Sequence, residues 1–187
     1  MASTLPKSKA RNLYLPEQVN QESMNKLTKS IIEINEDDAY LKKLYSIHDI
    51  DYVPKPINMY IDSYGGAVYQ CFGLLGVMDK SETPIHTIVT GAAMSCGFMI
   101  LISGHKRFGY EHSTPLYHQV STGFHGKVQD MEESLAETKR LQKKIEEFTL
   151  QRTNIPKKKL QQVLKNKIDW HMSAEEALGL GVIDGII

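Results

Sequence analysis

The stretch INMYIDSYGG at residues 57–66, together with IHTIVTGAAMSCG at residues 85–97, decides the fold. Each stretch begins as the apolar or alternating run that forms a strand and ends in small residues. In open α/β proteins, ligands and catalytic groups gather beyond the carboxyl ends of the strands. Gly65 and Gly66 expose main-chain N–H groups there, and Ser95 stands at the head of the next helix. This combination is typical of an acyl-transfer site, in which a nucleophile lies beside a pocket for an oxyanion.

The segments around these two stretches alternate between strand and helix patterns. Met24, Leu27, Ile31 and Ile34 mark one face of a helix. Further elements are predicted as strands at 11–15, 57–62, 85–90, 107–110 and 115–119, with helices at 68–83 and 95–101. This order predicts an α/β fold with parallel strands and crossover helices. Residues 36–55 are polar and irregular, so we expect a surface excursion there with at most one helical turn.

Residues 127–153 carry a narrow apolar seam that predicts one long helix. Apolar residues recur about every 3.5 residues amid dense charge; they are Val128, Met131, Leu135, Thr138, Leu141, Ile145 and Phe148. Because the seam is narrow, we expect the helix to project and pack against another subunit. A helix that lies over its own core is the alternative. A short basic helix after Pro156, a brief strand at 168–172 and a last helix after Ser173 complete the chain.

The composition favours a single globular domain over residues 1–187, with a loose tail at 1–10. Of the 187 residues, 41% are hydrophobic and 24% are charged, and the net charge is +0. No net field therefore draws the protein to nucleic acid or to an acidic membrane. The first ten residues have no apolar run, and no apolar segment reaches about 18 residues, so we expect neither a secretory signal nor a membrane span. Cys71 and Cys96 are expected to be reduced thiols in a cytoplasmic protein.

Several polar residues compete for roles in the chemistry. Ser95 is either a nucleophile or simply a small residue at a tight packing site. His118 lies at a strand end, but spacing alone does not choose it over His171. Three acids at strand ends are not ranked by composition: Asp62, Asp169 and Asp184. No metal-ligand spacing, dinucleotide fingerprint or phosphate-binding loop occurs, so we expect no metal and no cofactor.

Four segments in sequence order resemble the proteolytic subunit of the Clp protease, a family of self-compartmentalised serine peptidases. They are 58–66 (NMYIDSYGG), 91–97 (GAAMSCG), 106–119 and 169–184, and the resemblance runs from about residue 13 to the end. It implies a fold of stacked β–β–α units, shared with crotonases, with residues 127–153 as a protruding handle helix. It also implies a triad of Ser95, His118 and Asp169, with the N–H groups of Gly66 and Cys96 as the oxyanion hole.

The resemblance further implies a serine endopeptidase that cleaves peptides or unfolded proteins inside a chamber. That chamber is built from heptameric rings, up to a fourteen-subunit barrel, and is fed by an AAA+ ATPase. Tyr64 and Val120 stand where the family usually has proline. These departures keep open a catalytically inactive ring subunit or scaffold. A crotonase-type enzyme that acts on acyl-CoA is the other alternative, because that fold also offers two N–H groups to an oxyanion.

Overall fold

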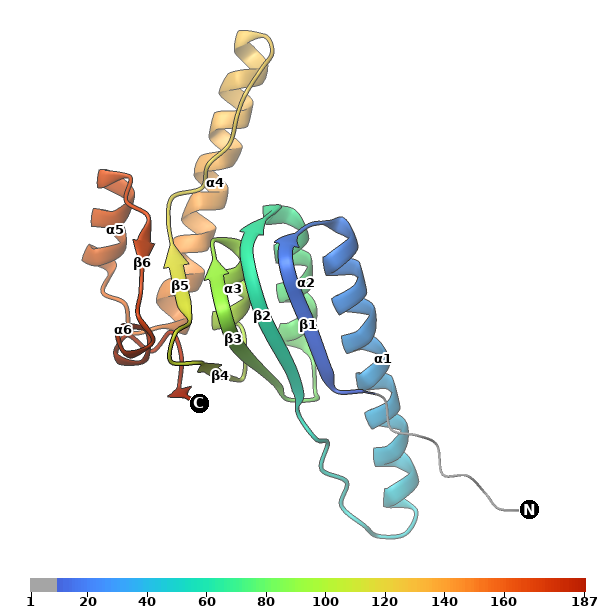
Figure 1. Cartoon of the computed structure of the whole chain (residues 1–187). Helices are drawn as coiled ribbons and strands as arrows, with labels where there is room; N and C mark the ends of the chain where they lie inside the picture. Colours follow the sequence, from blue (N-terminus) through green and yellow to red (C-terminus); the bar gives the residue numbers. More distant parts are fainter. Residues whose placement is uncertain (1–9) are drawn as a thin grey trace.

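A seven-stranded sheet organises the computed structural model, which describes residues 10–187 (Figure 1). The order β1-β2-β3-β4-β7 is parallel throughout, and β5 pairs parallel with the end of β3 and antiparallel with β6. The strands are β1 (Asn12–Val19), β2 (Ile57–Gly66), β3 (Ile85–Met94), β4 (Lys106–Gly109), β5 (Thr114–Tyr117), β6 (Trp170–His171) and β7 (Gly185–Ile186). The predicted α/β class with parallel strands is therefore confirmed. Of the expected tail at 1–10, only the last residue lies within the described residues.

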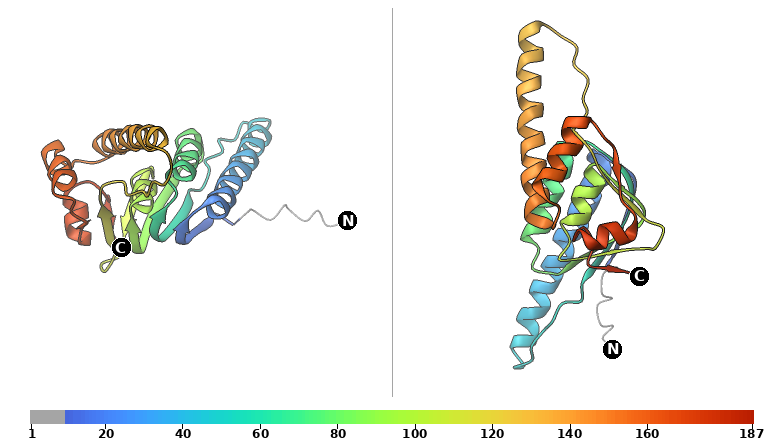
Figure 2. Two further views of the ribbon diagram at one scale, coloured as in Figure 1. Left: turned by 90° about the horizontal axis from the view of Figure 1, so that it is seen from above. Right: turned by 90° about the vertical axis from the view of Figure 1, so that its left-hand side faces the viewer.

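Helices connect the parallel strands and bury their apolar sides against the sheet. They are α1 (Gln21–Ser46), α2 (Val68–Lys80), α3 (Cys96–Ile102), α4 (Val128–Arg152), α5 (Lys157–Asn166) and α6 (Ala174–Gly179). Figure 2 shows α1, α2 and α4 along the same face of the sheet. Among the described residues, no helix is both long and apolar enough to cross a membrane.

The predicted apolar face of helix α1 is confirmed, but the helix is longer than predicted. Met24, Leu27, Ile31 and Ile34 are buried, as the spacing predicts. The expectation of an irregular segment from residue 36 is wrong, because the helix continues to Ser46. No Gly or Pro interrupts residues 20–53, so no residue type that breaks a helix is present. The return to β2 occupies only residues 47–56.

Strands β2 and β3 both run further than predicted. The expected turn at 63–66 is the end of β2, where Gly65 and Gly66 have φ values of +96° and +146°. Gly66 pairs with Val19 of β1, and a Cβ on Gly66 would lie 2.2 Å from the carbonyl oxygen of Val19. Glycine is thus required for this strand to finish close to its neighbour.

Helix α4 divides into a packed half and a projecting half. Leu141, Ile145 and Thr149 are buried against the body. Val128, Met131 and Leu135 are 67%, 38% and 46% exposed, and the first turns of the helix extend beyond the sheet (Figures 1 and 2). The observed bounds lie within one residue of the predicted 127–153. Packing of the exposed half against another subunit stays a prediction.

Candidate active site

Ser95 lies in the sharp turn between β3 and α3, where the sequence placed it. Its φ of 55° and ψ of −117° are unusual for a residue with a side chain, and such strained conformations are concentrated at functional sites. The amide of Ser95 donates to the carbonyl oxygen of Leu116 at 3.1 Å, which ties the turn to β5. The strained turn thus presents a half-buried serine at the carboxyl end of a central strand.

The end of β2 packs directly on this turn. A Cβ on Gly65 would lie 2.7 Å from the Cβ of Ser95, and one on Gly97 would lie 2.9 Å from the carbonyl oxygen of Ser63. Cys96 is the first residue of α3, so its amide has no partner within the helix. The Cys96 thiol donates to the carbonyl oxygen of Gly66 at 3.3 Å. The two residues expected to form the oxyanion hole therefore lie against each other, beside the serine.

His118 and Asp169 are brought together by the register of two short strands. In the antiparallel β5–β6 pair, Leu116 faces His171 and Tyr117 faces Trp170. One step further along the same ladder, His118 faces Asp169. Their side chains meet with Nδ1 and Oδ1 3.4 Å apart, and the Asp169 side chain is 66% exposed. This is a loose contact, longer than the usual range for a hydrogen bond.

The competing residues are placed elsewhere. His171 is exposed, and its Nδ1 lies 3.1 Å from the backbone carbonyl oxygen of Asp169. Asp62 accepts from the amide of Ala92 at 2.8 Å and so braces β3. Asp184 pairs with Arg107, with Oδ1 2.5 Å from Nη2. Of the three acids that the sequence left open, only Asp169 contacts His118.

A cavity of about 200 Å³ joins the serine turn to the histidine. Its lining residues are Tyr64, Gly66, Val68, Ser95, Cys96, Met99, Tyr117, His118, Val120, Ser121 and Ile145. Among the described residues, no hydrogen bond joins the Ser95 hydroxyl to His118, and Asp169 does not line the cavity. Catalytic hydrogen bonds are often long before substrate binds and tighten in the complex.

Burial and neighbouring groups set the proton affinity of three groups at this site. Burial, together with the charge of Glu146, raises the pKa of Tyr117 far above its usual range. A hydrogen bond with the Cys96 thiol, and then burial, raises the pKa of Cys71. The Cys71 thiol lowers the pKa of Cys96, although burial opposes this effect. Both cysteines are free and buried. Because the pKa values of Cys71 and Tyr117 are raised, both groups remain protonated at neutral pH.

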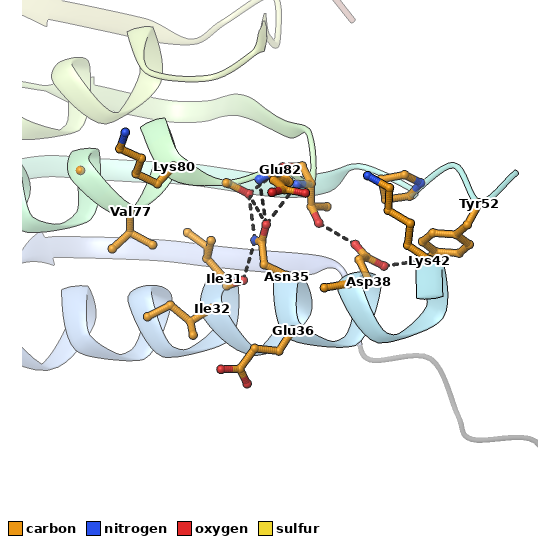
Figure 3. A pocket seen from close by; sticks show the side chains of 15 residues that line it. Ile31, Ile32, Asn35, Glu36, Asp38, Lys42, Tyr52, Val77, Lys80 and Glu82 are labelled. Atoms are coloured by element: carbon orange, nitrogen blue, oxygen red, sulfur yellow. Dashed lines mark hydrogen bonds between the residues drawn. The ribbon is translucent and has the colours of Figure 1, made fainter. Parts of the chain in front are cut away.

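A larger cavity, of about 580 Å³, lies between α1 and α2, away from Ser95 (Figure 3). Two of its polar side chains, Asn35 and Asp38, already have partners in the chain. Asn35 accepts from the amides of Glu82 and Thr83, and Asp38 accepts from the hydroxyls of Tyr52 and Thr83. Within residues 10–187, no histidine lines this cavity, whereas Ser95 and His118 both line the smaller one, so the smaller cavity is the candidate active site. No cluster of three or more metal-ligating side chains occurs in the described part of the chain.

Comparison with known proteins shows the family to which the chain belongs. Residues 7–187 match the family model described as Clp protease. The chain belongs to the Clp protease family. A Clp protease proteolytic subunit 2 from Bacillus licheniformis is 30% identical over 181 residues, which cover 96% of this chain and 87% of that protein. A proteolytic subunit from Deinococcus radiodurans is 35% identical over 133 residues, 70% of this chain and 64% of that protein. One from Treponema pallidum is 30% identical over 159 residues, 83% of this chain and 78% of that protein.

The Clp protease family is a family of peptidases, so the resemblance seen in the sequence motifs is confirmed. The sequence motifs did not reveal the apolar wall of the cavity, formed by Val68, Met99 and Ile145. Ile145 carried a signal, because it belongs to the seam of α4. Gln142, one turn earlier in that helix, was also missed. Nothing in the local sequence shows that it reaches the segment of His118.

Proposed function

We propose that this Clp family member is a serine-type endopeptidase with Ser95 as nucleophile, His118 as general base and Asp169 as its partner. Strand β5 carries the proposal, because its pairing with β6 sets His118 beside Asp169 and its pairing with the end of β3 brings His118 to the wall of the Ser95 cavity. Three residues far apart in sequence thereby converge on one site.

Each group has a defined role in this mechanism. His118 takes the proton of the Ser95 hydroxyl as its oxygen attacks a peptide carbonyl carbon, and then gives that proton to the leaving amine. Asp169 accepts a hydrogen bond from Nδ1–H, which fixes the tautomer and stabilises the charged imidazole. The amides of Gly66 and Cys96 donate to the tetrahedral oxyanion. Water then hydrolyses the acyl-enzyme with His118 again as base.

The cavity wall and the sheet supply substrate binding. Val68, Met99, Val120 and Ile145 favour an apolar substrate side chain next to the cleaved bond. The main chain of the peptide pairs in extended form with a strand edge. An unfolded segment fits this arrangement, because a folded chain does not present its backbone for such pairing.

Assembly and supply of substrate extend the proposal. The exposed half of α4, with Val128, Met131 and Leu135, forms the contact between stacked rings of subunits in the cytoplasm. The names of the relatives describe ATP-dependent proteases, and by analogy an AAA+ ATPase delivers unfolded chains to the chamber of this protein.

An activity-based phosphonate probe tests the chemistry. It labels the wild-type protein and fails to label Ser95→Ala, whereas Ser121→Ala, which changes another serine of the same cavity, labels like the wild type. Peptidase turnover is lost in Ser95→Ala and His118→Ala, apart from the small residual rate that the oxyanion hole and binding sustain. Equal labelling of wild type and Ser95→Ala contradicts the proposal. An oligomer without turnover points instead to the inactive scaffold.

A further inference from the structure

The side chain of Gln142 reaches from α4 to both sides of His118. Its Oε1 accepts a hydrogen bond from the amide of Val120 at 2.8 Å. Its Nε2 lies 3.5 Å from the hydroxyl of Tyr117. His118 stands between these two residues in the chain, so one amide side chain brackets the candidate base.

The segment that carries His118 has few other anchors. β5 ends at Tyr117, and residues 118–127 form neither helix nor strand. In the part of the chain that the structure describes, no other side chain bonds to the backbone of residues 118–126. Tyr117 itself is firmly held: it is 2% exposed, and its ring packs edge-on against Phe98 with centroids 5.7 Å apart. Gln142 therefore links a fixed residue and a loose one on either side of the histidine.

Helix α4 does not need Gln142 to stay in place. Leu141, Ile145 and Thr149 bury its packed face, and Arg152 forms an ion pair with Asp79 of α2. Loss of the Gln142 amide therefore releases the residue 120 segment without releasing the helix. The consequence falls on the base, because a misplacement of about 1 Å at a catalytic group lowers the rate by up to about 100-fold.

We propose that Gln142 is a positioning residue for the general base. It holds His118 at the wall of the cavity by fixing the backbone at Val120 and the hydroxyl of Tyr117, and it makes α4 part of the catalytic arrangement. This inference rests on the proposed peptidase function.

Kinetics of the full-length protein with a fluorogenic peptide test the proposal, with three variants compared. Gln142→Met keeps the length of the side chain but removes both hydrogen bonds. Gln142→Glu keeps an oxygen that accepts from the Val120 amide and from the Tyr117 hydroxyl. Gln151→Met is the matched control, because it makes the same change at an exposed glutamine of the same helix.

We expect Gln142→Met to lower kcat by about 10- to 100-fold with KM, melting temperature and solution mass unchanged. Gln142→Glu recovers most of that loss, and Gln151→Met behaves like the wild type. Wild-type kcat in Gln142→Met overturns the inference. So does a glutamate variant as slow as the methionine variant, or a kcat loss accompanied by a lower melting temperature. Full activity in Ser95→Ala would instead overturn the peptidase function itself.

Discussion

At the scale of single residues, the site depends on how closely two chain segments approach each other. Gly65 lies against Ser95, and its positive φ belongs to a conformation that residues with side chains rarely adopt. The strained backbone of Ser95 is held on one side by the hydrogen bond that its N–H donates to the carbonyl oxygen of Leu116, and on the other side by the end of β2. The conformation of Ser95 is thus determined by the segments packed against it.

Substitution of Gly65 by alanine tests this dependence. Because a Cβ would lie 2.7 Å from both Met94 O and Ser95 Cβ, we expect Gly65→Ala to cost about 1–3 kcal/mol of stability and to abolish peptidase turnover. Gly73→Ala is the control: this glycine lies within α2 with no atom near the new Cβ, so the change stabilises by about 0.5–1 kcal/mol. Urea unfolding gives both values. If both substitutions changed the free energy of unfolding in the same direction, the dependence on Gly65 would be refuted.

The cavity wall gives a second prediction for a single residue. Ile145 is 8% exposed and lines the cavity beside Ser95. Ile145→Ala removes buried methyl groups and costs about 2 kcal/mol or more, while it enlarges the space for a substrate side chain. Cleavage of a peptide library, analysed by mass spectrometry, should then favour larger side chains next to the scissile bond. An unchanged preference would place that side chain elsewhere.

At the scale of elements, short pairings and buried polar contacts decide where segments begin and end. The extended part of α1 carries Asp38, which is 6% exposed and binds Arg11 before β1, Tyr52 in the return segment and Thr83 before β3. Four segments therefore meet at one carboxylate. Burial alone would raise its pKa, but hydrogen bonds from Arg11, Thr83 and Tyr52 outweigh burial and lower the pKa of Asp38.

The lowered pKa of Asp38 predicts a pH dependence of stability. Its contribution is fully present above the unfolded-state pKa of about 3.9 and is lost as pH falls through the lower folded-state value. We expect Asp38→Asn to cost about 2 kcal/mol at pH 7 and the gap to the wild type to narrow below about pH 4. Denaturation at several pH values measures the gap. A gap that stays constant down to pH 3 would show that the charge is not what matters.

Periodic elements could be predicted from the sequence, whereas pairings could not. The apolar face of α1 and the seam of α4 follow from helical spacing, so both helices were found. The extension of α1 past residue 36 carries Asp38 to distant partners, and no local pattern reveals those contacts. The choice of His118 over His171 and of Asp169 over the other acids depends on the β5–β6 register. From the residues alone the choice stayed open, and only the family resemblance favoured His118 and Asp169.

At the scale of the whole molecule, the projecting half of α4 is the feature that a lone subunit does not explain. The exposed apolar seam of a projecting helix is unfavourable in water unless another surface covers it. The seam residues Val128, Met131 and Leu135 all lie on this half, and the family relationship makes a second subunit the proposed cover.

A charge placed on the seam tests that contact. We expect Leu135→Glu to reduce the solution mass of the assembly, because it places a charge in an apolar interface, while the subunit stays folded. Ala136→Glu adds the same charge at the adjacent exposed position, off the seam, and should leave the mass unchanged. Analytical ultracentrifugation gives both masses. An intact assembly in Leu135→Glu would mean that rings join through other surfaces.

The two-residue strand β6 has a consequence for how the chain tolerates change in length. Between His118 and Asp169 the polypeptide runs out through residues 118–127 and returns along α4, yet the short pairing of Leu116 and Tyr117 with His171 and Trp170 sets which acid meets the imidazole. Insertions in the loop near residues 122–126 therefore leave the pairing of His118 with Asp169 unchanged. A single residue added just before Trp170 would instead put a different side chain opposite the histidine.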